Sequence, residues 1–224
     1  MAFHPAQTWK ERGLQVKALQ CKCKSILNNL KLPRDDARAL GMINVGSICL
    51  TLAEVPFKIF HEVETKEGRP KVMKLLGLRT IVDLEKTLID FDNNIKCSFV
   101  TMVQFALENC IEHVLDAIPG EKACRTFSQS CRHLIQITNL ADPDIKYSIL
   151  MVPARIRNSL HAGGIPGHGS KSVEVDGVQY VFEKGKRIAC ASWSHLIHSF
   201  SHGLDIYEEM LCSPIVKSIS QIPI

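Results

Sequence analysis

The stretch from Phe99 to Ala117 constrains the fold most strongly. Its apolar residues recur at spacings of three and four positions, which is the period of one face of an α-helix. They are Phe99, Val103, Ala106, Cys110, Val114 and Ala117. Further apolar neighbours widen this face to more than half of the helix circumference, so other elements must cover the helix. We therefore expect a mainly α-helical protein with this helix at the centre of its core.

The length and composition suit one folded unit with a substantial core. The chain has 224 residues, of which 46% are hydrophobic, and this is enough for a large single domain. We expect a single helical domain over 1–224. Within it, the pattern separates an N-terminal helical subregion at 1–94, a helical core at 95–165, a β-meander at 172–191 and a C-terminal helix at 192–212.

Start signals place the remaining helices. Thr8 and Glu11 form a capping box ahead of a helix that extends towards Leu30. Asp142 and Pro143 begin another helix, because aspartate caps helix N-termini and proline is tolerated at the first helical position. Further helices are expected from about Asp35 to Val55, from Thr80 to Phe91 and from Glu121 to Asn139.

Stop signals interrupt this helical pattern at three places. Asp92-Asn93-Asn94 is expected to close the helix that begins near Thr80. Residues 61–70 are charged and poor in apolar side chains, so we expect a solvated connection there. Gly163 and Gly164 can adopt the left-handed conformation that ends a helix.

Beyond these glycines the pattern changes from helix to strand. Residues 172–175 and 178–182 flank Asp176-Gly177, the signature of a β-hairpin with a tight type I′ turn. A third short strand is expected at 187–191, and the chain then finishes with a helix from about Ser192 and a loose tail.

Composition favours a reducing compartment. Nine cysteines, an odd number without a dense framework, argue against a disulfide scaffold. The N-terminal residues lack a secretory signal pattern, and charged residues interrupt both of the most apolar windows, 41–60 and 98–118. We therefore expect a cytoplasmic protein that does not span a membrane. The net charge of +4 is compatible with a polyanionic partner.

The segment Pro153 to Gly164 contains the side chains best suited to catalysis. Pro153 removes one helical hydrogen bond and is expected to kink the helix about one turn before the arginines. On a helix, Arg157 and His161 lie about 40° apart and Asn158 lies about 60° from His161, so all three reach one small volume. Arg155 lies about 120° from His161 and joins them only if the helix unwinds or a second chain contributes. A cation, a polar side chain and a titratable base suit phosphodiester chemistry.

This segment resembles the active-site motif of the HEPN superfamily of α-helical proteins. Arg157-Asn158 matches the arginine and polar residue of the motif, and His161 matches its histidine. Three residues separate Arg157 from His161, which is shorter than the interval usual in the family. Arg155 gives a longer interval but is followed by Ile156 instead of a polar residue, so either arginine can match the family's role.

The resemblance implies a fold and an activity. The fold would be a HEPN-like helical bundle, centred on 95–165, with a small β-hairpin or meander inserted before the C-terminal helix. The activity would be metal-independent RNA cleavage without a cofactor, at the interface of a homodimer. His161 would act as general base or acid, Arg157 with Arg155 would stabilise charge on the phosphate, and Asn158 would position a partner. A toxin or phage-defence role, with an antitoxin or defence partner protein, would follow.

Other residues suggest how RNA would be held. Lys184, Lys186 and Arg187 follow the hairpin and are expected near the end of the preceding helix. His168 lies in the glycine-rich segment 162–169, which lacks the sequence context of a nucleotide-binding loop. We expect these four side chains to contact RNA phosphates. The alternative is a HEPN-like module that binds RNA or a partner protein without cleaving RNA.

A second cluster, His195, His198 and His202, forms one stripe on the C-terminal helix. Imidazoles at this spacing can bind a metal ion. The sequence offers no obvious carboxylate ligand and no general base of the H-E-x-x-H type. We therefore assign no metal site, and metal-dependent hydrolysis through these histidines stays a lesser alternative.

Overall fold

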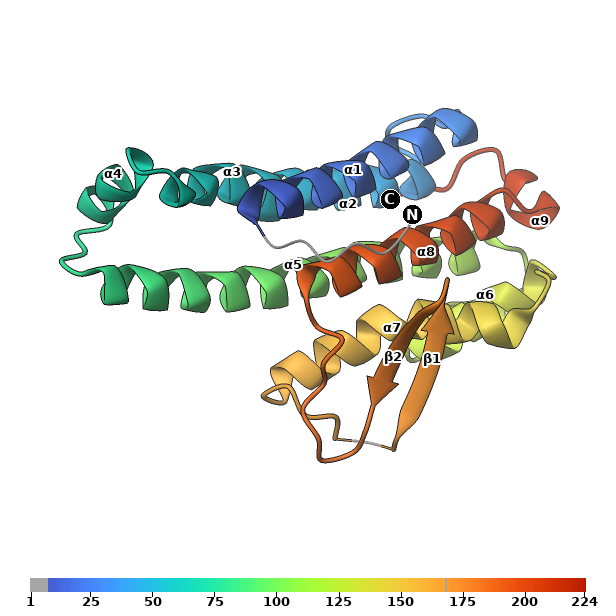
Figure 1. The fold of residues 1–224 in the computed structure, drawn as a ribbon. Coiled ribbons are helices and arrows are strands. Elements are labelled where there is room, and N and C mark those ends of the chain that lie inside the picture. The colour runs from blue at the N-terminus through green and yellow to red at the C-terminus, as the bar shows by residue number, and fades with distance from the viewer. Residues whose placement is uncertain (1–7, 168) are drawn as a thin grey trace.

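The computed structural model describes residues 8–167 and 169–224 and shows a mainly helical protein with one small sheet (Figure 1). The helices are α1 (Trp9–Leu30), α2 (Ala37–Cys49), α3 (Val55–His61), α4 (Gly68–Leu75), α5 (Ile81–Ala117), α6 (Phe127–Ile137), α7 (Pro143–His161), α8 (Trp193–Leu211) and α9 (Pro214–Lys217). A π-helical segment, Leu50–Glu54, and a 3₁₀ turn, Glu62–Glu64, flank α3. The strands are β1 (Lys171–Val175) and β2 (Val178–Phe182).

Helix α5 is the centre of the fold, as its apolar period predicts. Helices α1 and α2 lie on one side of it, whereas α6 and α7 lie on the other (Figure 1). The side chains of Phe99, Val103 and Val114 are fully buried in the main hydrophobic cluster. A Cβ at Gly41 of α2 would lie 2.8 Å from the Cβ of Cys110, so this glycine lets α2 approach α5 closely.

Helix α5 is much longer than expected, and the predicted stop at Asp92-Asn93-Asn94 is wrong. The carboxylate of Asp92 accepts hydrogen bonds from Arg12 Nη1 at 3.0 Å and from Trp193 Nε1 at 2.7 Å. It also pairs with Lys96 one turn along the helix. These tertiary bonds satisfy a polar side chain that would otherwise favour a helix end. The predicted boundary between 1–94 and 95–165 therefore falls inside α5.

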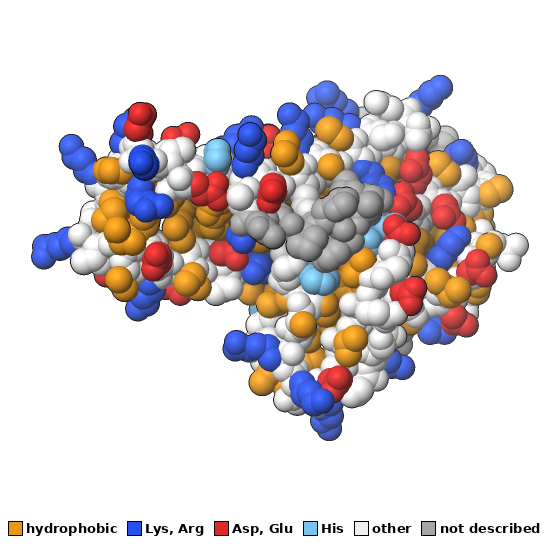
Figure 2. Space-filling model, in the orientation of Figure 1, with side chains coloured by type: hydrophobic (Ala, Val, Ile, Leu, Met, Phe, Trp, Pro, Cys, Tyr) orange, Lys and Arg blue, Asp and Glu red, His pale blue; other side chains and the backbone are white. Residues whose placement is uncertain are grey.

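Helices α3, α4 and the N-terminal part of α5 extend from the rest as an arm (Figure 1). Phe60, Val63, Val72 and Leu84 form a second buried cluster there. Residues 61–70 include the 3₁₀ turn and the start of α4, and they are mostly exposed, as expected of a solvated connection, although Val63 and Gly68 are buried. Hydrophobic side chains are also visible on the surface of this arm (Figure 2). Exposed apolar residues of α4 and α5 include Leu75, Val82 and Ile89.

One helical stretch, Ala37–Glu64, is long and apolar enough to cross a membrane by its length and composition. It has a mean hydropathy of 1.5 over its most apolar window, and 44% of that window is buried inside the molecule. Met42 and Val45 are completely buried against the surrounding helices. Core helices of compact proteins have these same properties.

The first residue of α6 and the N-terminal cap of α7 differ from expectation. Helix α6 begins at Phe127, where the Thr126 hydroxyl accepts a hydrogen bond from the backbone of Gln129, and not near Glu121. Helix α7 does begin at Pro143, but Asp142 has a φ of 52° and its side chain makes no capping hydrogen bond. The capping box of Thr8 and Glu11 is present as predicted.

The two-stranded sheet is the predicted hairpin. Its strands pair antiparallel with Val175 opposite Val178, and Asp176 and Gly177 have φ values of 46° and 77°, as a type I′ turn requires. The third strand expected at 187–191 is absent from the described residues, so the meander prediction is wrong. The backbone N–H of Ile188 instead donates to the carbonyl of Gly164, which attaches this segment to the end of α7.

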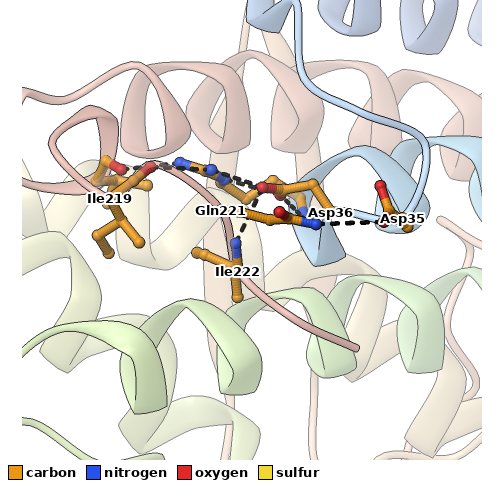
Figure 3. A network of polar contacts seen from close by, with 7 residues as sticks. Asp35, Asp36, Ile219, Gln221 and Ile222 are labelled. Atoms are coloured by element: carbon orange, nitrogen blue, oxygen red, sulfur yellow. Dashed lines mark hydrogen bonds and ion pairs between the residues drawn. The ribbon is translucent and has the colours of Figure 1, made fainter.

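The C-terminal residues are held in place, in contrast to the loose tail expected. Arg38 donates two bonds to Asp36, at 2.9 and 2.6 Å, and also donates to the carbonyls of Val216 and Ile219. The backbone N–H of Ile222 donates to Asp36 (Figure 3). The Asp36 and Arg38 side chains are 0% and 2% exposed. This buried network joins the C-terminal end of the chain to the start of α2.

Candidate site at the C-terminal end of helix α7

The predicted HEPN-like segment forms the last two turns of α7 and its termination. The N–H of Gly164 donates to the carbonyl of Ser159, and the N–H of Gly163 donates to that of Leu160. These two bonds define a Schellman motif. Gly163 and Gly164 have φ values of 70° and 87°, so both glycines adopt the left-handed conformation predicted for them. Helical structure continues on both sides of Pro153.

His161 is exposed at the last position of α7. Its Nε2 lies 3.1 Å from the hydroxyl of Thr101 on α5. This contact fixes the imidazole at the junction between the two helices. The neutral ring can accept a proton from a group that replaces the Thr101 hydroxyl, and the imidazolium that forms can donate one.

Arg157 and Asn158 interact directly with each other. The guanidinium donates from Nε and Nη2 to Asn158 Oδ1, at 3.2 and 3.1 Å. Both residues line a surface pocket of about 500 Å³ together with Glu108 and Tyr147. Because Asn158 is exposed and Arg157 is half-buried, the pair presents a cation and an amide at the mouth of this pocket.

Arg155 lies between that pocket and a neighbouring one. It lines the first pocket, and it also lines a second of about 280 Å³ with Asn158, Lys171 and Phe182. Its Nη1 atom is buried without a hydrogen-bond partner among the described residues, and burial lowers the pKa of this guanidinium from its ordinary value. A buried donor without an acceptor is costly, and an anion in either pocket would supply the acceptor.

Glu108 supplies the negative charge beside these arginines. Burial raises the pKa of its carboxyl group, the neighbouring Glu112 raises it further, and Arg157 acts in the opposite direction. Glu108 lies one turn from Glu112 on the polar side of α5, where the sequence allows a solvated face or, as the lesser alternative, a carboxylate that orients the arginines. Its place in the same pocket as Arg155 and Arg157 depends on the packing of α5 against α7, which no local pattern reveals.

The predicted RNA-binding cations lie on the surface beyond the hairpin. Arg187 packs on the end of α7, since a Cβ at Gly164 would lie 3.4 Å from the Cγ and Nε of Arg187. Lys184 and Lys186 are exposed on the loop after β2, and Lys186 pairs with Glu183. His168 lies outside the described residues.

The C-terminal histidines occupy a different part of the molecule. Burial, together with the nearby His202, lowers the pKa of His198 to about 4. Ser192 caps the start of α8, where its hydroxyl accepts a hydrogen bond from the backbone N–H of His195 and lies 2.7 Å from His195 Nδ1. Asp176 of the hairpin turn approaches His202, with 3.7 Å between Oδ2 and Nε2. This carboxylate is far from the histidines in sequence, so the helical spacing alone missed it.

The structure thus brings together only part of the predicted catalytic group. Arg155, Arg157 and Asn158 share one pocket region, whereas His161 turns towards α5 and Thr101. Comparisons of the chain with protein-family models, with curated protein sequences and with solved structures found no match.

Proposed function

We propose that this protein is a metal-independent endoribonuclease of the HEPN type that acts as a homodimer. The observation that carries the proposal is the arrangement at the end of α7. Arg155, Arg157 and Asn158 line adjoining surface pockets, and His161 stands exposed one turn further along the same helix. This arrangement offers positive charge, an amide and a titratable base to one bound polyanion.

Each side chain has a role in the proposed reaction. His161 removes the proton from a ribose 2′-hydroxyl, whose oxygen then attacks the adjacent phosphorus. The arginines stabilise the charge that develops on the phosphate oxygens, and Asn158 holds Arg157 through its Oδ1 atom. The bond from phosphorus to the 5′-oxygen breaks, and this oxygen takes the proton that His161 has accepted. The products are a 2′,3′-cyclic phosphate and a free 5′-hydroxyl.

A second copy of the chain completes the proposed site. Within one chain Arg155 lies about 120° around the helix from His161, and His161 faces Thr101 on α5. Because Asn158 and His161 are exposed, two α7 ends can approach each other directly. The His161 of one protomer would then lie near the arginines of its partner.

The surface beside this site suits a polymer. Lys and Arg side chains gather at the open end of the hairpin (Figure 2). Exposed cations of this region include Lys171, Lys184 and Arg187. They would contact successive phosphates, so RNA affinity should fall as salt concentration rises. A toxin or phage-defence role with an antitoxin or defence partner, and a cytoplasmic location, are part of the same proposal.

The test is RNA cleavage by the purified protein in the presence of excess chelator. We expect wild-type protein to cut RNA and His161→Ala to lose at least about 100-fold of the rate, the range in which general acid–base catalysis contributes. His61→Ala is the matched control and should keep full activity, since His61 lies on the arm and pairs there with the nearby Glu64. Undiminished cleavage by a folded His161→Ala variant would remove His161 from the mechanism.

A non-catalytic RNA-binding or protein-binding module is the second candidate. The contact between His161 Nε2 and Thr101 favours it, because a histidine held by a structural partner is less available for proton transfer. Under this alternative RNA binds with salt-sensitive affinity and remains intact. The cleavage assay separates the two candidates directly.

A further inference from the structure

We infer that Asp176, His198 and His202 form a binding site for a divalent transition-metal ion such as Zn²⁺. One ligand comes from the turn of the β-hairpin and two come from successive turns of α8. The potential ligand atoms of the three side chains lie within 4.8 Å of one another. This inference concerns a site separate from the end of α7, and it is independent of the proposed ribonuclease activity.

The geometry is close to that of a metal centre. His202 Nε2 lies 3.7 Å from Asp176 Oδ2, and the two imidazole rings lie 4.6 Å apart between centroids. Nitrogen and oxygen ligands bind Zn²⁺ at about 2.0–2.2 Å, which places neighbouring ligand atoms about 3–4 Å apart. Asp176 is exposed, so its side chain has room to rotate towards the two imidazoles.

Tyr180 fixes the tautomer of His198 in which Nε2 can bind a metal ion. Its hydroxyl donates to the backbone carbonyl of His195 at 3.0 Å and lies 2.8 Å from His198 Nδ1. Because the hydroxyl proton is donated to this carbonyl, the phenolic oxygen accepts a hydrogen bond from the Nδ1–H of His198. Nε2 is then the unprotonated nitrogen of the neutral ring. Metal-binding histidines are held by such a hydrogen bond from the opposite nitrogen.

His202 has a matching arrangement. Its Nδ1 lies 4.0 Å from the Asp205 carboxylate one turn along α8, which favours the proton on Nδ1. Its Nε2 is buried, and no described residue provides it with a hydrogen-bond partner. A carboxylate behind one nitrogen and a metal at the other is a common arrangement in metalloproteins.

The ligand set indicates the class of ion. Two imidazoles and one carboxylate suit first-row transition ions such as Zn²⁺ better than Mg²⁺ or Ca²⁺, which prefer oxygen ligands. Three side chains of the described residues leave at least one coordination position for water or another ligand. The bound ion would fasten the hairpin turn to α8.

The test is Zn²⁺ titration of the untagged chain by calorimetry after chelator treatment, with the thermal unfolding midpoint as a second measurement. We expect one equivalent to bind, and Zn²⁺ at 100 times its Kd to raise the midpoint by about 5–10 °C. His202→Ala should abolish both effects. Asp176→Asn, which keeps a residue tolerated in the turn, should weaken binding by at least about 10-fold, and Asp205→Asn by about 10- to 100-fold.

His195→Ala is the control, since His195 belongs to the same sequence pattern but is outside the ligand set. It should bind Zn²⁺ as the wild type does. Co²⁺ in place of Zn²⁺ should give visible absorption bands that His202→Ala lacks. Absence of stoichiometric binding, or binding that both His202→Ala and Asp176→Asn leave unchanged, would overturn the site. Neither result bears on RNA cleavage in chelator, so the two proposals can fail separately.

Discussion

The guanidinium of Arg155 is a cation in a half-buried position, and its Nη1 atom has no hydrogen-bond partner within residues 8–167 and 169–224. A buried donor of this kind destabilises the fold unless a ligand accepts a hydrogen bond from it. We expect Arg155→Met to leave the free energy of unfolding unchanged or to raise it by about 1 kcal/mol. RNA binding should weaken, and the slope of log affinity against log salt should decrease by about 0.7 to 1.

Urea unfolding and RNA titration at several salt concentrations measure these two effects. Arg79→Met is the control, because Arg79 is exposed on the arm and should leave binding unchanged. Loss of stability in Arg155→Met, with RNA affinity intact, would assign Arg155 a structural role.

Thr101 tests whether His161 must be held in position. Thr101→Val removes the hydroxyl near Nε2 and preserves the shape of the side chain. If His161 is the base, its misplacement should lower the cleavage rate by about 10- to 100-fold without changing RNA affinity. Thr87→Val is the matched control, because it removes a hydroxyl that donates to the carbonyl of Asp83 within α5. Faster cleavage by Thr101→Val would instead show that the contact with Thr101 makes His161 less available for proton transfer.

At the scale of elements, the termination of α7 determines where Arg187 lies. Gly163→Ala and Gly164→Ala both place a side chain at positive φ and should each cost about 1 kcal/mol of stability. Only Gly164→Ala adds a contact at 3.4 Å with Arg187. We expect similar unfolding midpoints for the two variants and weaker RNA binding for Gly164→Ala alone. Equal RNA affinity of the two variants would show that Arg187 does not contribute to RNA binding.

The junction between α2 and the C-terminal tail predicts a dependence of stability on pH. Burial alone would raise the pKa of Asp36, but bonds from Arg38 and from the backbone of Ile222 outweigh it and hold this pKa below its ordinary value. The folded state then binds fewer protons than the unfolded state at acidic pH. The stabilisation from Asp36 is complete above about pH 4 and is lost as the pH falls below that.

Asp36→Asn should remove this acid-dependent contribution and destabilise the fold at pH 7 by about 3–5 kcal/mol, since Arg38 is left buried without its counter-ion. Asparagine still caps α2, so the change isolates the ion pair. Asp35→Asn, at an exposed position, should change stability by less than about 0.5 kcal/mol. Chemical denaturation between pH 3 and 7 gives both values. An Asp36→Asn variant as stable as wild type would contradict this role.

Local signals predicted elements well where they act through neighbouring residues. The capping box at Thr8 and Glu11, the start at Pro143 and the turn at Asp176-Gly177 are all present. The helix stop at Asp92 failed because its carboxylate bonds to Arg12 and to Trp193, which are distant in sequence.

The same limit applies to the sites. The motif in α7 could be found because its side chains are close in sequence. Glu108 beside the arginines, Thr101 beside His161 and Asp176 beside His202 all depend on contacts between separate elements. Helical periodicity gives the face of a residue but not the element that packs against that face.

At the scale of the whole molecule, the proposed ribonuclease site requires two chains. Light scattering should give a mass of twice the 25.0 kDa of one chain. Mixed dimers of Arg157→Ala and His161→Ala chains should recover part of the cleavage activity that each variant lacks alone, because the two motifs then share one site. Mixed dimers that form and remain inactive would show that each chain acts by itself.

The most direct test of the proposed ribonuclease activity is the chemical identity of the RNA product in excess chelator. Mass spectrometry of a short RNA cut by the protein should show a 2′,3′-cyclic phosphate on one fragment and a 5′-hydroxyl on the other. The same RNA with a single 2′-deoxy nucleotide at the cleaved position should resist cleavage there, because the attacking hydroxyl is missing. Cleavage at the 2′-deoxy position, or RNA that binds and stays intact, would contradict the assignment of the α7 end as a ribonuclease site.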